Sequence, residues 1–416
     1  MIIKKSFLVL VSSLYCLANT SVSIANPNEF SNIKDQMLES GFENIQVIKS
    51  EDKNDLIDSY KITFENRTFL YEIHAIGHLL KKLKPIIKPN SHLEIYPQSE
   101  GKIVSRLSFY YQDYLDFINN NLTEEEFSKK VDIYFNPKDP FEKKDNALFS
   151  HSDLTFSGAY IFDQTLGPIL LFSPYFTTYL GNGFSFNTRY RTVFYNVENG
   201  FDFAKNTKLV EPSFQFTTFD YKTPVIDNIP LYTTFKVGHN YYGNHSFILG
   251  NDTQYLLFDG IMTFNLSSGI VLNLENNNSK VSTDFSLTPY GQIYLSKYDL
   301  VFEGGGGKFL GDNYGIWGRA TRQLNNADVG FSLYKILKTS STDPNTTQFN
   351  FEYTIYFGNA ESIKASPFRV TSARTFSGNL FAGRGNIGQV SRTTNSIYLK
   401  RLFPEYLKSH LYYWKE

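Results

Sequence analysis

The stretch FNFEYTIYF, at residues 349–357, alternates between two kinds of side chain. One set is aromatic or aliphatic and the other is mainly polar: the first is Phe349, Phe351, Tyr353, Ile355 and Phe357, and the second is Asn350, Glu352, Thr354 and Tyr356. Successive side chains of a β-strand point to opposite faces, so a period of two indicates a strand. The stretch therefore predicts a strand with one apolar face and one largely polar face.

The same period recurs along residues 146–358, for example at 154–162, 184–194 and 270–275. Turn residues such as Asn182-Gly183 and Asp259-Gly260 separate the segments. We count roughly twelve such segments of about ten residues, with room for one or two more. This pattern is typical of an outer-membrane β-barrel. A soluble β-sandwich also alternates, but the long segments and the aromatic residues near their ends favour the barrel.

We therefore predict a mainly β fold. Its larger part is a transmembrane antiparallel β-barrel of roughly 12–14 strands, preceded by a small α+β periplasmic domain. Composition agrees with this choice. The 416 residues include 38 Phe and 29 Tyr, and 17% of the chain is aromatic although only 19% is charged. Disordered chains lack aromatic residues, so this content excludes disorder. No apolar run of about 20 residues follows the N-terminus, which excludes a helical membrane protein.

The first 25 residues read as a secretory signal peptide. Lys4 and Lys5 precede a short apolar stretch, and Ser23-Ile24-Ala25 matches the small residues of a cleavage site. Cys16 is the only cysteine, and it lies within this segment. We expect the exported protein to begin near Asn26 and to have no disulfide.

Residues 26–145 predict the α+β domain. A helix is expected over 31–40, ended by Gly41, and a second helix over 71–87. Thr123 and Glu126 have the spacing of a capping box at the start of another helix. Short alternating runs between these helices predict strands.

Two local patterns resemble ligand sites. His74 and His78 are four residues apart on the helix expected over 71–87, but no third ligand lies near them in the sequence. Residues 303–309 read EGGGGKF, and Phe309 stands where a phosphate-binding loop needs Ser or Thr. We interpret the histidines as structural and the glycines as a sharp bend or a close approach of backbones. No metal or cofactor is expected.

The C-terminal segment, residues 359–416, is basic. From residue 364 onward it carries nine Lys or Arg against two Glu, a balance of +7. Such a block either attracts anionic partners or forms a solvated tail. The run Leu411-Tyr412-Tyr413-Trp414 is aromatic, as final barrel strands often are. We therefore also consider this segment as a source of strands that complete the barrel.

Several short segments resemble proteins of the YjbH family. They are GFENIQV at 41–47, FENRTF at 64–69, AIGHLL at 75–80 and GKFLGDNYG at 307–315, followed by RQL at 322–324 and VGF at 329–331. The resemblance runs from about residue 36 to about residue 358. It implies an outer-membrane β-barrel linked to the production of exopolysaccharide and capsule. Members of that family are usually longer, so this chain resembles a shortened form.

The expected function is non-catalytic: export or surface assembly of a polysaccharide at the bacterial outer membrane. Expected partners are the polysaccharide, outer-membrane lipid and lipopolysaccharide, and periplasmic export proteins that bind residues 26–145. The near balance of 40 basic and 41 acidic residues argues against nucleic acid. Arg189, Arg191 and Arg319 are the candidate polysaccharide contacts inside the barrel. A porin-like or structural barrel and a surface hydrolase barrel remain alternatives.

Overall fold

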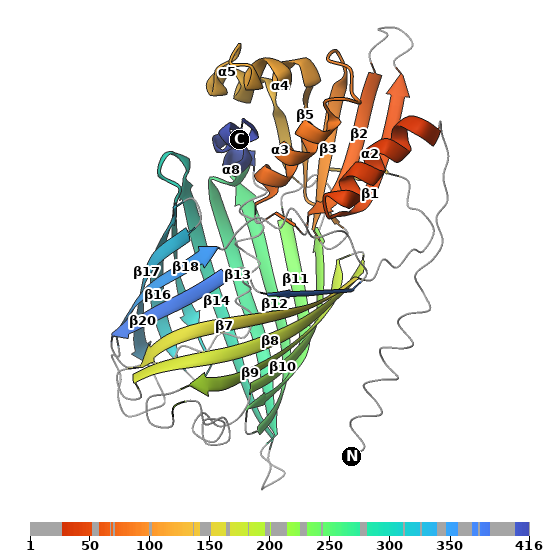
Figure 1. The fold of residues 1–416 in the computed structure, drawn as a ribbon. Coiled ribbons are helices and arrows are strands. Elements are labelled where there is room, and N and C mark those ends of the chain that lie inside the picture. Colours follow the sequence, from red (N-terminus) through yellow and green to blue (C-terminus); the bar gives the residue numbers. More distant parts are fainter. Residues whose placement is uncertain are drawn as a thin grey trace, which may run out of the picture.

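Figure 1 shows a small α+β domain standing at one end of a large, curved β-sheet in the computed structural model. The structure describes residues 27–51, 58–66, 68–69, 71–99, 102–135, 137–141, 151–163, 167–181, 183–195, 200, 214–224, 231–242, 244–274, 281–310, 313–324, 327–338, 347–356, 368–372, 375–382 and 404–415. The predicted signal peptide and most of the basic C-terminal segment lie outside these residues.

The small domain combines four helices with a mixed sheet. Its elements are α2 (Pro27–Glu39), β1 (Phe42–Glu51), β2 (Asp58–Asn66), α3 (Glu72–Leu83), β3 (His92–Ser99), β4 (Lys102–Ile103), β5 (Ser105–Tyr110), α4 (Tyr111–Ile118), α5 (Glu124–Lys130) and β6 (Asp132–Phe135). The strand order is β1-β2-β3-β5-β6, with β4 paired to β3. Only β2 and β3 are parallel, and α3 makes the crossover that parallel neighbours require.

The local signals in this domain are confirmed. Gly41 ends α2 with a φ of 82°, a conformation that glycine adopts without strain. Thr123 and Glu126 form both hydrogen bonds of the capping box at the start of α5. The helix expected over 71–87 ends earlier, at Leu83. Its apolar face, including Ile76, Leu79 and Leu80, is fully buried on the sheet.

The large sheet contains twelve antiparallel strands that pair in chain order. They are β7 (His151–Asp163), β8 (Gly167–Gly181), β9 (Phe184–Tyr195), β10 (Phe214–Pro224), β11 (Leu231–Tyr242), β12 (Asn244–Leu257), β13 (Met262–Leu274), β14 (Val281–Leu295), β15 (Leu300–Lys308), β16 (Tyr314–Leu324), β17 (Ala327–Lys338) and β18 (Thr347–Tyr356). Short 3-10 turns, η2 (Phe258–Gly260) and η3 (Ser296–Tyr298), join β12 to β13 and β14 to β15.

The large sheet is antiparallel as predicted, but its twelve strands do not close into a barrel in this structure. The first and last strands of the antiparallel series, β7 and β18, do not pair with each other. Instead β20 (Thr375–Ala382) pairs antiparallel with β18 and parallel with β7, and β19 (Phe368–Ser372) also lies parallel to β7. As the thirteenth strand, β20 runs in the same direction as the first strand, so its pairing with β7 is parallel.

The interpretation of residues 411–414 as part of a final strand is also wrong. Leu411–Trp414 forms a 3-10 helix, η4, directly after α8 (Pro404–Ser409). We call residues 404–414 the strap. Trp414 is fully buried in the core of the small domain, against the rings of Phe109 and Phe127. Its indole Nε1 donates a hydrogen bond to the carbonyl oxygen of Ile73 at 3.0 Å. Aromatic residues at the chain end therefore complete the first domain rather than the large sheet.

The strap also contacts the large sheet, and a second contact joins the two parts directly. Helix α8 packs against β6 of the small domain and against the η2 and η3 turns of the large sheet. Figure 1 shows α8 between the small domain and the large sheet. On β11, the Tyr232 ring lies 5.1 Å from that of Phe135, and its hydroxyl donates to the carbonyl oxygen of Ile103 at 3.4 Å. The small domain is thus seated on the rim that carries η2 and η3.

Glu72, at the start of α3, makes the stability of the small domain depend on pH. Burial raises the pKa of this carboxyl from 4.5 to about 8, the hydrogen bond from Asn66 opposes the shift, and the charge of Glu65 adds to it. A raised pKa in the folded state favours the protonated acid. Its stabilising effect is therefore fully present below pH 4.5 and is lost as the pH rises towards 8.

We expect Glu72→Gln to remove this dependence. The wild-type domain should lose at most about 1.4 kcal/mol of stability per pH unit across that range, and the variant should not. Glu39→Gln, at an exposed position of α2, is the control and should retain the wild-type slope. The measurement is urea unfolding of the full chain followed by Trp414 fluorescence, in a Trp317→Phe background. Equal slopes for wild type and Glu72→Gln would contradict the assignment.

Candidate functional site

The large sheet exposes most of its large apolar side chains and buries many of its polar ones. On β13, Phe264 is 54% exposed whereas the adjacent Asn265 is 1% exposed. The same contrast holds on the neighbouring strand β12, where Leu249 is 52% exposed and Asp252 is 9% exposed. The sheet is strongly curved (Figure 1), and the low exposure of these polar side chains indicates that they line its inner, concave face. A water-soluble protein would have the opposite arrangement.

Arg319 is the centre of an ion-pair network on the inner face. Its guanidinium lies between two carboxylates: Nη2 is 2.7 Å from Oε2 of Glu352 on β18, and Nη1 is 3.6 Å from Oε2 of Glu303 on β15. The Glu303 side chain is 3% exposed and that of Arg319 is 17% exposed. Two acids therefore surround one base, and the guanidinium charge is compensated within the wall.

Hydrogen bonds extend this network across six strands. Towards β13, Gln292 Nε2 donates to Glu303, and Thr263 Oγ1 donates to Gln292 Oε1 at 3.0 Å. Towards β18, Ser332 Oγ donates to Glu352 Oε1 at 2.9 Å, and Asn350 Nδ2 donates to Ser332 Oγ at 3.2 Å. The backbone register places these side chains in neighbouring rows. The network therefore ties one side of the sheet together from within.

Arg319→Ala should destabilise the sheet, because it leaves Glu303 and Glu352 without their shared cation. We expect a loss of about 1.5–3 kcal/mol, the usual range for a hydrogen bond to a charged group. Arg319→Lys keeps the charge but loses the two-sided geometry, so its stability should lie between those of Arg319→Ala and wild type. The measurement is urea unfolding of the folded sheet in detergent micelles. An Arg319→Ala protein as stable as wild type would contradict this role.

The other two candidate arginines lie on β9, seven strands from Arg319 along the sheet. Arg189 Nε donates to Ser173 Oγ at 3.2 Å. Close by, Asn187 accepts a hydrogen bond from Thr177 and donates one to Asp220. The backbone of Arg191 pairs with Phe214, and its side chain lies outside the described residues. The sheet does not place Arg319 beside these arginines, and sugar contact by any of them remains a prediction.

The glycine run on β15 allows backbones to approach closely, as the sequence indicates. A Cβ atom on Gly305 would lie 2.3 Å from the carbonyl oxygen of Pro289, and one on Gly307 would lie 2.1 Å from that of Leu287. Gly305 separates the rings of Tyr290 and Trp317, whose centroids are 5.4 Å apart on the inner face. Phe309, fully buried, packs on this pair. The run thus makes room for an aromatic cluster.

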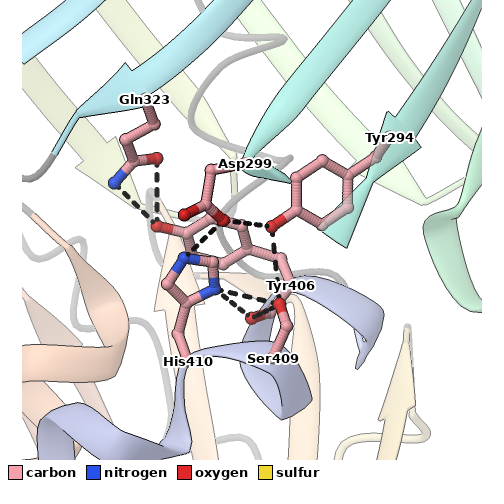
Figure 2. Close-up of polar contacts among 6 residues, drawn as sticks. All are labelled: Tyr294, Asp299, Gln323, Tyr406, Ser409 and His410. Atoms are coloured by element: carbon pink, nitrogen blue, oxygen red, sulfur yellow. Dashed lines mark hydrogen bonds and ion pairs between the residues drawn. The ribbon is translucent and has the colours of Figure 1, made fainter. Parts of the chain in front are cut away.

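A second polar cluster joins the strap to the rim of the large sheet (Figure 2). The Tyr406 hydroxyl lies 3.2 Å from both Nε2 and Oε1 of Gln323, near the end of β16. His410 Nε2 lies 3.0 Å from Asp299 Oδ1, and the Tyr294 hydroxyl donates to the same oxygen at 3.1 Å. The contacts of Tyr406 and His410 secure the strap to turns of the sheet.

Asp299 is charged in this cluster. Burial alone would raise its pKa, but the hydrogen bond and charge of His410, the hydrogen bond from Tyr294 and the charge of Arg322 outweigh burial. Together they hold the pKa of Asp299 below its usual range. The contribution of this carboxylate to stability is therefore present above its unfolded pKa and is lost as the pH falls through the folded value.

Ser409, His410 and Asp299 are the residue types of a hydrolase triad, but their hydrogen bonds do not fit one. The base in such a triad accepts the serine proton on an unprotonated ring nitrogen. Here His410 Nδ1, 3.0 Å from Ser409 Oγ, is also 2.8 Å from the carbonyl oxygen of Tyr406. A carbonyl oxygen only accepts, so Nδ1 carries the proton. Ser409 donates to that same carbonyl oxygen, which favours a structural role for the cluster.

The predicted histidine pair also has structural contacts. His78 Nε2 lies 3.0 Å from Ser40 Oγ, and its ring packs on Phe69. The His74 ring packs on Tyr413 of the strap at 4.2 Å. Within the ranges that the structure describes, no group of three or more His, Cys, Asp or Glu is placed to hold a metal ion. No helix in those ranges is long and apolar enough to cross a membrane.

Sequence reasoning did not find the strap–rim cluster. The contacts between strap and rim join residues 83 to 115 positions apart, and no local period joins Tyr294 to Ser409. The only signal was the aromatic run at 411–414, which also fits a strand. Comparison with known protein families and with curated proteins finds no match for the chain. The likeness to the YjbH family therefore remains a prediction from the residues quoted above.

Proposed function

We propose that the protein is a non-catalytic outer-membrane β-barrel protein whose α+β domain lies in the periplasm, and that it assists export or surface assembly of a polysaccharide. The observation that carries the membrane part is the inverted large sheet, with Phe, Leu, Ile and Val exposed outside and Thr, Asn, Gln and Ser buried inside. Lipid outside and water inside would match these faces.

Strand length supports the same proposal. Strands β11 to β14 are 12, 14, 13 and 15 residues long. A tilted strand needs only about 9–11 residues to cross the hydrocarbon core. The remaining residues would reach both headgroup regions. Closure of the barrel would then occur through the region that follows β18, where β20 already bridges β18 and β7.

The polysaccharide part rests on the resemblance and on the chemistry of the inner face. Buried amides, hydroxyls and compensated charges, such as those around Arg319, match the hydroxyl groups of hydrated sugar. The seated small domain offers a fixed periplasmic surface for export proteins. No cofactor is needed for such a role.

Deletion of the gene, followed by assay of surface polysaccharide, tests the proposal. We expect less surface polysaccharide and recovery when the wild-type chain is restored. Unchanged polysaccharide would remove the proposed role. A porin-like barrel is the second candidate, favoured by the polar inner face itself, and it predicts ion conductance in planar bilayers with no polysaccharide defect.

Arg189→Gln combined with Arg191→Gln tests the predicted sugar contacts. We expect reduced surface polysaccharide with normal amounts of protein in the outer membrane, since these changes remove two cationic donors. Lys297→Gln, at an exposed position of the η3 turn, is the control and should leave polysaccharide unchanged. Normal polysaccharide in the double variant would contradict the assignment.

A further inference from the structure

The apolar outer face is interrupted by a groove on β15 to β18. The groove has a volume of about 660 Å³, within the roughly 300–1,000 Å³ of small-molecule sites. Its floor is the backbone at Gly318 and Ala320, which have little or no side chain. Phe302, Phe331, Leu333 and Phe349 border it, each at least 42% exposed. Opposite the floor, on the inner face, is the Glu303–Arg319 ion pair.

Lysines lie immediately beyond this groove on the same outer face. Lys335 is exposed and lies two residues from Leu333 along β17, in the row formed with Ile316 and Thr347. Lys338 follows at the end of the strand, with its Nζ 5.8 Å from the ring centroid of Tyr314. Neither lysine has an ion pair among the residues that the structure describes.

These positions match the two ends of an anionic lipid. On the rim that carries the small domain, β16 ends at Leu324 and β17 begins at Ala327. Lys335 therefore lies near the opposite end of β17. On the proposed function, that opposite end faces the outer leaflet. A lysine beside an interfacial tyrosine attracts phosphate, and the apolar groove below it accepts acyl chain.

We propose that this face binds a phosphorylated, acylated lipid of the outer leaflet, with its phosphate at Lys335 and Lys338 and an acyl chain over Gly318. The inference rests on the proposed membrane location and adds a specific lipid-binding site to it. Charge complementarity selects this occupant, because a second copy of the chain would place the same lysines against each other.

Gly318→Leu tests the acyl part. A Cβ on Gly318 would have its nearest heavy atom 3.8 Å away, so a larger side chain fills the groove without backbone strain. Gly291 is the matched control: it lies on β14 on the same outer face, also with 3.8 Å of space, and outside the groove. The probe is diphosphorylated lipid A, titrated into detergent-purified full-length protein and followed by native mass spectrometry.

We expect Gly318→Leu to weaken lipid A binding about tenfold or more, and Gly291→Leu to bind as wild type does. Lys335→Gln and Lys338→Gln should each weaken binding about fivefold and leave binding of zwitterionic phosphatidylcholine unchanged. Wild-type affinity in Gly318→Leu, or equal loss in Gly291→Leu, would overturn the site. Protein that stays soluble and monomeric without detergent would instead overturn the membrane location itself.

Discussion

Replacement of Trp414 by Ala should destabilise the small domain by about 3–5 kcal/mol, the usual cost of removing a large buried aromatic residue from a core. Trp414 is fully buried among Phe109, Tyr114 and Phe127, and its Nε1 proton satisfies the carbonyl oxygen of Ile73. The variant loses these contacts and leaves a cavity beside Gly77. That glycine faces the indole, since a Cβ there would lie 3.1 Å from Trp414 Cδ1.

Hydrogen exchange of the full chain measures this effect without relying on tryptophan fluorescence. Amides of α3 and α5 should exchange much faster in Trp414→Ala than in wild type, while amides of β11 to β14 stay protected. Tyr412→Ala, in the same 3-10 helix but at a side chain that is 36% exposed, should change little. Wild-type protection of α3 in Trp414→Ala would show that the strap is not part of the domain core.

A lysine on the outer face of the large sheet should hinder insertion into the membrane. Leu249 lies in the middle of β12, is 52% exposed, and pairs with Val237 and Ile270 on neighbouring strands. On a lipid-facing surface, Leu249→Lys costs about 2–4 kcal/mol near the bilayer midplane. In water the same change at an exposed site would cost almost nothing. The variant should therefore insert poorly into liposomes.

Two controls separate the membrane effect from a folding defect. Leu249→Ala keeps the face apolar and should insert normally. Phe258→Lys changes a residue that is 72% exposed in the η2 turn, outside the strands, and should also insert normally. Equal insertion of Leu249→Lys and wild type would contradict a lipid-facing outer surface.

The sequence was sufficient for the strands and for the faces of the large sheet, because both depend on the local period of two. The twelve antiparallel strands and the exposed apolar side chains of β18, such as Phe349 and Ile355, follow from that period. The capping box of α5 was likewise predictable, since its two partners are three residues apart.

Long-range partners could not be predicted in the same way. Arg319 was a candidate for sugar contact, and nothing local indicated that Glu303 and Glu352, on two other strands, would hold its guanidinium. The pairing at the ends of the large sheet could not be predicted for a related reason, since alternation does not specify which strand pairs with β7. The strap was missed because an aromatic run at a chain end is compatible with a strand or with a core-filling turn.

The location of Leu249 relative to lipid tests the central claim most directly. The only cysteine is Cys16, in the predicted signal peptide, so single cysteines can be introduced and labelled with a fluorophore. Leu249→Cys marks the outer face, and Tyr110→Cys marks a site on the small domain that is 50% exposed. In liposomes, we predict that brominated lipid quenches the label at position 249 and that aqueous iodide does not, with the reverse at position 110. Quenching by iodide but not by brominated lipid at position 249 would contradict the account.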